Sequence, residues 1–250
     1  MTTRKTILIT GASSGIGRGM ARELAKRGRD LALCARRADR LEALRDELTA
    51  AHPNARVFVR QLDVLDFEQV FEVFRAFRDD LGTLDRVVVN AGLGKGQPIG
   101  TGYFRANRQT AETNFVAALA QCEAAVEIFR AQNAGHLVAI SSVSAVRGMR
   151  RNLTTYAATK AGLAHLAEGI RADLLGTPIR VSTIYPGFIR SEMNERVKHT
   201  PFIIDTETGS RKLVEAIERE PVSAYVPWWP WAPLAFLMKR LPLKYAARLG

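Results

Sequence analysis

Short apolar runs alternate with longer helical segments along the 250-residue chain, and this alternation limits the fold more than any other feature. Runs that are apolar throughout are typical of strands in a parallel sheet covered by helices on both faces. Right-handed crossovers between such strands produce a doubly wound sheet. We therefore predict one α/β domain, residues 1–250, with a Rossmann fold and a parallel sheet. Its predicted strands are Thr6–Thr10, Leu31–Ala35, Val57–Val59, Arg86–Asn90, His136–Ser141, Arg180–Ile184 and Ala224–Val226.

Two irregular regions follow predicted strands. Gly92–Gly102 comes after the fourth strand, and Phe188–Thr208 comes after the sixth. Ligands of doubly wound sheets bind at the carboxyl ends of the strands. We expect both regions to wall a binding site, and we assign 188–210 as a substrate-loop region.

A glycine-rich loop joins the first predicted strand to the first helix. Glycines allow the tight turn there and let the backbone approach a pyrophosphate, while the helix N-terminus offers free N–H groups. The strand before and the helix after are the context that this motif requires. The loop predicts a dinucleotide site made by Gly11, Ser13, Ser14, Gly15, Ile16 and Gly17.

The end of the second strand indicates which dinucleotide binds. An NAD site usually has a carboxylate here for the ribose 2′-hydroxyl, but this chain reads Cys34-Ala35-Arg36-Arg37. A guanidinium matches a 2′-phosphate by charge-assisted hydrogen bonds. We therefore predict NADP(H), held chiefly by Arg36. Arg37 either shares this role or is a solvated arginine that opens the next helix.

A serine, a tyrosine and a lysine predict proton-transfer chemistry. Tyr156 and Lys160 share one face if their segment is helical. A neighbouring ammonium lowers the pKa of a phenol from about 10 toward the range useful for proton transfer. Ser142 ends the fifth strand region and can hold a substrate oxygen; Ser141 is the competing assignment.

Together these motifs resemble the short-chain dehydrogenase/reductase family, in order over residues 6–193. The resemblance implies that Tyr156 is the general acid/base, that Lys160 lowers its pKa and binds the nicotinamide ribose, and that Ser142 orients the substrate oxygen. It also implies that Asn114 holds a water of a proton relay. Further implied cofactor contacts are Asp63 and Val64 at the adenine, Asn90, Ala91 and Gly92 after the fourth strand, and Pro186, Gly187, Ile189 and Ser191 after the sixth.

The function implied is hydride transfer between NADP(H) and a carbonyl or alcohol, on a lipophilic or acyl/lipid-linked substrate. The alternative is a cofactor-binding regulatory or scaffold protein on the same fold with little turnover. Helices around 111–130 and 155–175 are the family's usual dimer face, so we expect a homodimer. The histidines show no metal-ligand spacing, and we predict no metal.

The formal net charge of +11 allows nucleic acid, a membrane surface or an anionic ligand as partner. No recognised nucleic-acid motif supports the first, and we predict no nucleic-acid partner. Arg147, Arg150 and Arg151 lie between Ser142 and Tyr156, where they either bind an anionic substrate group or stay solvated. Arg150-Arg151 and the Trp/Pro-rich ending are also weakly similar to reductases of lipid-linked sugars in actinobacterial cell-wall synthesis.

The C-terminal extension, 221–250, contains all three tryptophans, half of the ten prolines, four basic residues and no acidic residue. Leu234, Leu237, Met238 and Leu241 follow a helical spacing. This stripe either packs on the substrate pocket or a partner subunit, or attaches the protein peripherally to an anionic membrane. Two cysteines in apolar runs and the absence of an apolar run of spanning length predict a cytoplasmic protein.

Overall fold

A computed structural model describes residues 3–192 and 201–246 of the chain. Part of the predicted substrate-loop region, both ends of the predicted domain and Arg248 of the extension lie outside these residues. The chain forms a seven-stranded sheet in the order β3-β2-β1-β4-β5-β6-β7, and every neighbouring pair is parallel. The predicted α/β Rossmann fold is therefore confirmed. Its strands are β1 (Thr6–Thr10), β2 (Asp30–Ala35), β3 (Val57–Gln61), β4 (Arg86–Val89), β5 (Gly135–Ile140), β6 (Ile179–Pro186) and β7 (Ser223–Val226).

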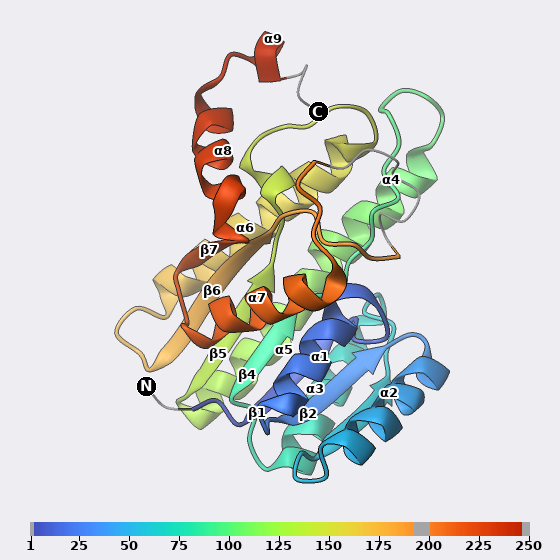
Figure 1. The fold of residues 1–250 in the computed structure, drawn as a ribbon, viewed down its shortest axis with the longest axis vertical. Helices are drawn as coiled ribbons and strands as arrows, with labels where there is room; N and C mark the ends of the chain where they lie inside the picture. The colour runs from blue at the N-terminus through green and yellow to red at the C-terminus, as the bar shows by residue number, and fades with distance from the viewer. Residues whose placement is uncertain (1–2, 193–200, 247–250) are drawn as a thin grey trace.

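Helices cover both faces of the sheet because successive side chains of each central strand are apolar. In β1, Leu8 faces one core, whereas Ile7 and Ile9 face the other. The first core is closed by α3 (Phe67–Leu81), α5 (Ala117–Gln132) and α6 (Thr154–Asp173). The second is closed by α1 (Gly15–Lys26), α2 (Ala38–Ala51) and α7 (Thr206–Glu218), which lie in front of the sheet in Figure 1.

The strand order reverses direction at β1, which pairs with β2 on one side and with β4 on the other. The helices that follow β1 and β4 therefore go to opposite faces of the sheet. This is the topological switch point at which doubly wound sheets bind their ligands. It places the glycine-rich loop and the segment after β4 side by side.

The helix predicted around 111–130 is divided in the structure. It consists of α4 (Phe104–Ala111), a π-helical turn (Glu112–Val116) and then α5. Short π-helical turns are rare and are frequent at functional sites. This one contains Asn114, one of the predicted site residues.

The end of the substrate-loop region is also more regular than predicted. α7 begins at Thr206, because the Asp205 carboxylate accepts a hydrogen bond from the Thr208 amide at 2.7 Å and caps the helix. The irregular region therefore stops before the predicted Thr208. The C-terminal extension forms α8 (Trp228–Arg240) and α9 (Leu243–Ala246).

A buried ion-pair cluster lies at the other edge of the sheet, where the strands begin. Arg86 is only 1% exposed, and its guanidinium donates to Glu218 at 2.6 Å, to Glu220 at 3.3 Å and to His136 Nδ1 at 2.8 Å. Burial, followed by the charges of Arg86 and Arg4, lowers the pKa of His136 well below its usual value. The cluster ties β4 and β5 to the end of α7.

We expect Glu218→Ala to lower the free energy of unfolding by about 3 kcal/mol, because the buried guanidinium loses a carboxylate partner. Urea unfolding measures this difference. Glu47→Ala is the matched control, since it removes the exposed partner of Arg22 and is expected to cost less than about 1 kcal/mol. Equal losses in the two variants would contradict a stabilising role for the cluster.

Candidate active site

The glycine-rich loop lies directly against the residues that follow β4. A Cβ atom at Gly11 would lie 2.9 Å from Ala91 Cα, and one at Gly17 would lie 2.5 Å from the Gly11 carbonyl oxygen. Only glycine fits such approaches. The Asn90 side-chain amide donates to the Thr10 carbonyl at 2.8 Å, which holds the two segments together.

The Thr10 hydroxyl completes this junction. It accepts hydrogen bonds from the amides of Asn90 and Ala91, both at 3.0 Å. Asn90 Oδ1 is buried and has no hydrogen-bond partner in the described part of the chain. A buried oxygen without a partner can accept a hydrogen bond from a bound ligand.

Arg37 lies over the loop and is half-exposed. Its guanidinium donates to Ser14 Oγ at 2.6 Å and to Ser13 Oγ at 3.3 Å, and it pairs with Glu192 at 3.0 Å. Arg36 is exposed and makes no ion pair with residues 3–192 or 201–246. Both arginines therefore lie at the end of β2, one turned inward and one turned outward.

The segment after β6 folds back over the loop. A Cβ atom at Gly15 would lie 3.3 Å from Ser191 Cβ. Ile189 is buried and forms a bridge with Ile204, which fixes the base of the segment. The structure thus brings Ser191 and Ile189 to the glycine-rich loop, as the resemblance implies.

Pro186 ends β6, and the Gly187 amide donates to the Val226 carbonyl at 2.8 Å. The indole of Trp231 covers Gly187 so closely that a Cβ atom there would lie 2.0 Å from Nε1. Phe188 meets the same indole edge-on, with ring centroids 5.3 Å apart. The extension therefore supplies one wall beside the end of β6.

Ser142, and not Ser141, lies beside Tyr156. The Ser142 hydroxyl is close enough to the tyrosine side chain to lower its pKa, and it accepts from the Ser144 amide at 3.1 Å. The Ser141 hydroxyl instead donates to the Lys160 carbonyl at 2.8 Å, which ties β5 to α6. The geometry gives Ser141 a structural role and leaves Ser142 facing the phenol.

Lys160 points back toward the carboxyl end of β5. Its Nζ donates to the Ile140 carbonyl at 2.9 Å. A Cβ atom at Gly92 would lie 3.4 Å from this nitrogen and 3.3 Å from Asn114 Oδ1. Gly92 thus lies against both side chains, and the segment after β4 approaches the ammonium closely.

Asn114 holds that segment in place. Its Oδ1 accepts from the Leu93 amide at 2.6 Å, and its Nδ2 donates to the Leu93 carbonyl at 2.8 Å and to Thr159 Oγ1 at 3.3 Å. The π-helical turn aims this amide at the loop. Asn114 therefore joins the segment after β4 to α6, and its water-holding role stays a prediction.

Burial dominates the protonation of the two titrating residues. It lowers the pKa of Lys160 to about 8. It raises the pKa of Tyr156, and the hydrogen bond to Ser142 opposes this only in part. The sequence predicted that the Lys160 ammonium lowers the Tyr156 pKa, but burial outweighs this effect in the free protein. The phenol therefore keeps its proton at neutral pH.

The remaining predicted residues follow the carboxyl ends of other strands or lie in the loop after β5. Asp63 accepts from the Leu65 amide at 3.1 Å just after β3, and Val64 is buried beside it. Ile16 packs on the core under α1. Among the three arginines between Ser142 and Tyr156, Arg150 and Arg151 are exposed, whereas Arg147 donates to carbonyls of the extension.

Two residues that contact the predicted site residues were not themselves predicted from the sequence. Glu192 pairs with Arg37 and with Arg40 at 2.5 Å, and Trp231 packs on Gly187. No motif marks either residue. The Trp/Pro-rich composition of the extension is the one signal that singles out the region of Trp231.

The geometry fits a dinucleotide. The close backbone approaches at Gly11 and Gly17 leave a shallow cradle without side chains at the N-terminus of α1, the place where a pyrophosphate binds. The N-cap residue Ser14 makes no capping hydrogen bond of its own. Free amides and the Arg37 guanidinium therefore face the same place.

Comparisons with known proteins agree with this geometry. The family model "short chain dehydrogenase" matches residues 5–201. An uncharacterized oxidoreductase of Mycobacterium tuberculosis is 52% identical over 248 residues, which cover 99% of this chain and 98% of that protein.

Solved structures are similar as well. An alcohol dehydrogenase of Thermococcus sibiricus, complexed with 5-hydroxy-NADP, has a TM-score of 0.78 at 25% identity and covers 89% of this chain and 95% of that one. An NADPH-dependent 3-quinuclidinone reductase of Rhodotorula rubra has a TM-score of 0.76 at 27% identity, with coverage of 86% and 84%. The chain belongs to the short-chain dehydrogenase/reductase family and is an oxidoreductase of the NAD(P) type.

Proposed function

We propose that the protein is an NADP(H)-dependent oxidoreductase that reduces a carbonyl group to an alcohol. The observation that carries this proposal is the placement of Ser142 near Tyr156, which lies one helical turn from Lys160 on α6. These three groups lie next to a loop shaped for a dinucleotide. The bound cofactor would supply the hydride, and the protein supplies position and the proton.

The direction of proton transfer follows from the pKa of the phenol. Because burial raises the pKa of Tyr156, the side chain is a proton donor at neutral pH. Ser142 accepts or donates at the same point and would hold the carbonyl oxygen within reach of the phenol. Reduction uses this donor directly, whereas oxidation needs a phenolate that forms only at alkaline pH.

The preference for NADP(H) rests on the end of β2. Two guanidinium groups stand where a carboxylate would favour NAD, and Arg37 already lies on the two serines of the loop. The Thermococcus sibiricus alcohol dehydrogenase is complexed with 5-hydroxy-NADP and the Rhodotorula rubra reductase is NADPH-dependent, which supports the same choice.

A lipophilic substrate fits the wall built by Phe188, Phe202 and Trp231, whose rings meet edge-on. Oxidation of NADPH can be followed against 3-oxoacyl thioesters, ketosteroids, quinones, aldehydes and keto-sugars. Turnover of none of these classes would contradict the proposal. The proposal also places the enzyme in the reducing cytoplasm, since Cys34 and Cys122 are free, buried thiols.

We expect the protein to bind NADPH more tightly than NADH, and Arg36→Gln to reduce this ratio of affinities about tenfold through the loss of a charge-assisted bond. Arg37→Gln is expected to act in the same direction. Arg45→Gln, on the outer side of α2, is the control and leaves the ratio unchanged. Fluorescence titration measures both affinities; equal affinities in the unaltered protein would refute the role of the arginines.

We expect Tyr156→Phe to lower kcat/KM for carbonyl reduction by about 10²–10⁴-fold, because the proton donor is lost, while NADPH affinity is unchanged. In the unaltered protein, kcat/KM for reduction should fall as pH rises through about 8, because Lys160 loses its proton there, before Tyr156 does. Lys160→Arg removes this step because a guanidinium does not titrate there. Full turnover by Tyr156→Phe would disprove the mechanism.

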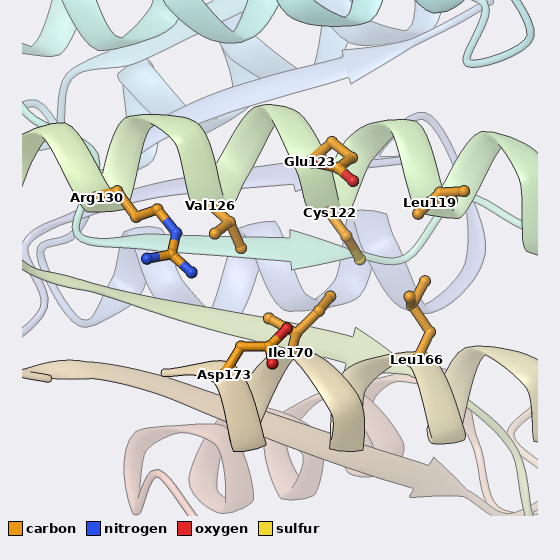
Figure 2. A pocket seen from close by; sticks show the side chains of 8 residues that line it. All are labelled: Leu119, Cys122, Glu123, Val126, Arg130, Leu166, Ile170 and Asp173. Carbon is orange, nitrogen blue, oxygen red and sulfur yellow. The ribbon is translucent and has the colours of Figure 1, made fainter. Parts of the chain in front are cut away.

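The homodimer predicted from the sequence is also part of the proposal. A groove of about 160 Å³ lies between α5 and α6 (Figure 2) and is partly apolar. Glu123 and Arg130 on α5 and Asp173 on α6 flank it, so a second copy can offer both apolar contacts and opposite charges. The other residues lining the groove are Leu119, Cys122, Val126, Leu166 and Ile170.

We expect sedimentation to give twice the chain mass of 27.6 kDa. Val126→Glu should weaken self-association by about tenfold or more, because a charge would be buried in the groove. Val222→Glu, at an exposed position just before β7, is the control. Sedimentation of the unaltered protein at the mass of one chain would contradict the dimer.

A further inference from the structure

The edge of the sheet that carries the site has a strongly uneven charge. Three segments that follow the carboxyl ends of β4, β5 and β7, residues 91–107, 141–153 and 227–246, contain eight Lys or Arg and no Asp or Glu. The rest of the chain is close to balance, with 28 basic and 25 acidic residues. Seven of the eight are exposed: Lys95, Arg105, Arg150, Arg151, Lys239, Arg240 and Lys244.

The same edge exposes large apolar side chains. Nine of the fifteen exposed large hydrophobic residues in the described part of the chain lie in 99–104 and 227–246. Trp228 and Trp229 are 68% and 69% exposed, and Phe104 is 73% exposed. Figure 1 places α8, α9 and the loop before α4 at one end of the molecule. The other members are Ile99, Tyr103, Phe236, Leu237, Leu243 and Tyr245.

The extension is firmly attached to the site and does not bury this apolar surface. Trp231 is its anchor, buried on Gly187 against Phe188. Arg147 donates to the carbonyls of Met238 and Leu241, which fixes the end of α8 over the loop between Ser142 and Tyr156. The apolar stripe of Leu234, Leu237, Met238 and Leu241 is only partly buried, and Leu237 is 49% exposed.

We propose that this end of the molecule is a membrane-docking surface that binds the headgroup region of an anionic phospholipid bilayer. Tryptophan, tyrosine and basic residues are the side chains that suit this boundary, where an apolar interior meets negative headgroups. The attachment is peripheral, since no helix among the described residues is long and apolar enough to cross a bilayer.

Charge argues against a second copy of the chain as the occupant. Two copies meeting through this surface would bring eight basic residues of one against eight of the other, with no carboxylate in the three segments to pair with them. Like charges across an interface oppose association. An anionic bilayer has the complementary sign and accepts the aromatic rings as well.

The docking explains how a lipophilic substrate could reach the site. Because Trp231 and Arg147 join the surface to the walls beside Tyr156, docking would turn the mouth of the site toward the bilayer. This consequence rests on the proposed function, whereas the docking itself does not.

The test uses the full chain with vesicles of phosphatidylglycerol and phosphatidylcholine, and with vesicles of phosphatidylcholine alone. All three tryptophans lie in the extension, so their emission reports on this surface alone. We expect co-sedimentation and a blue shift with the anionic vesicles. Trp228→Ser with Trp229→Ser should abolish the blue shift, and Lys239→Gln with Arg240→Gln and Lys244→Gln should weaken binding on the order of 100-fold.

Matched controls change the same kinds of residue elsewhere. Leu175→Ser with Val222→Ser removes exposed apolar side chains at the opposite edge, and Arg45→Gln with Arg75→Gln and Arg78→Gln removes three exposed or half-exposed charges from α2 and α3. Both controls should bind as the unaltered protein does.

Failure to sediment with anionic vesicles would overturn the proposal. Equal losses of vesicle binding in the control variants would overturn it as well. So would binding of random duplex DNA at physiological salt, seen as a mobility shift, that added vesicles do not reverse. None of these readouts needs substrate or cofactor. A protein that binds vesicles but reduces no carbonyl would therefore contradict the proposed function and leave the docking intact.

Discussion

The hydrogen bonds of Thr10 join the two halves of the sheet at the point on which the site depends. Its hydroxyl accepts from the amides of Asn90 and Ala91, and its carbonyl accepts from the Asn90 side chain. These bonds bring the loop after β1 and the segment after β4 into contact at the strand-order reversal. Gly11 and Gly17 are required there because any side chain would separate the two segments.

The proton-transfer groups depend on this junction through a short chain of contacts. The segment after β4 continues to Leu93, whose backbone is held by Asn114. Asn114 in turn touches Thr159, the neighbour of Lys160 on α6. The cofactor cradle and the Tyr156 centre are thus parts of one packed unit, so a displacement of either is felt by the other.

Much of the fold and of the site could be predicted from local pattern. β1, β2, β4 and β5 are buried along their whole length, and all seven strands fall at the predicted places to within a few residues. Ser142, Tyr156 and Lys160 come together because a strand end and one helix face fix them. The π-helical turn at Asn114 and the capped start of α7 could not be predicted, since both depend on packing and on single hydrogen bonds.

By itself the sequence determined the order of strands and helices, the glycine cradle, the pair of arginines after β2 and the serine, tyrosine and lysine set. These follow from periodicity and from residue chemistry at fixed spacing, which act over short distances along the chain. Only the tertiary structure decided that Arg37 turns onto the loop, that burial and not the ammonium governs the Tyr156 pKa, and that Trp231 walls the site. Each of these depends on residues brought together from distant parts of the chain, and burial exists only once the chain has folded.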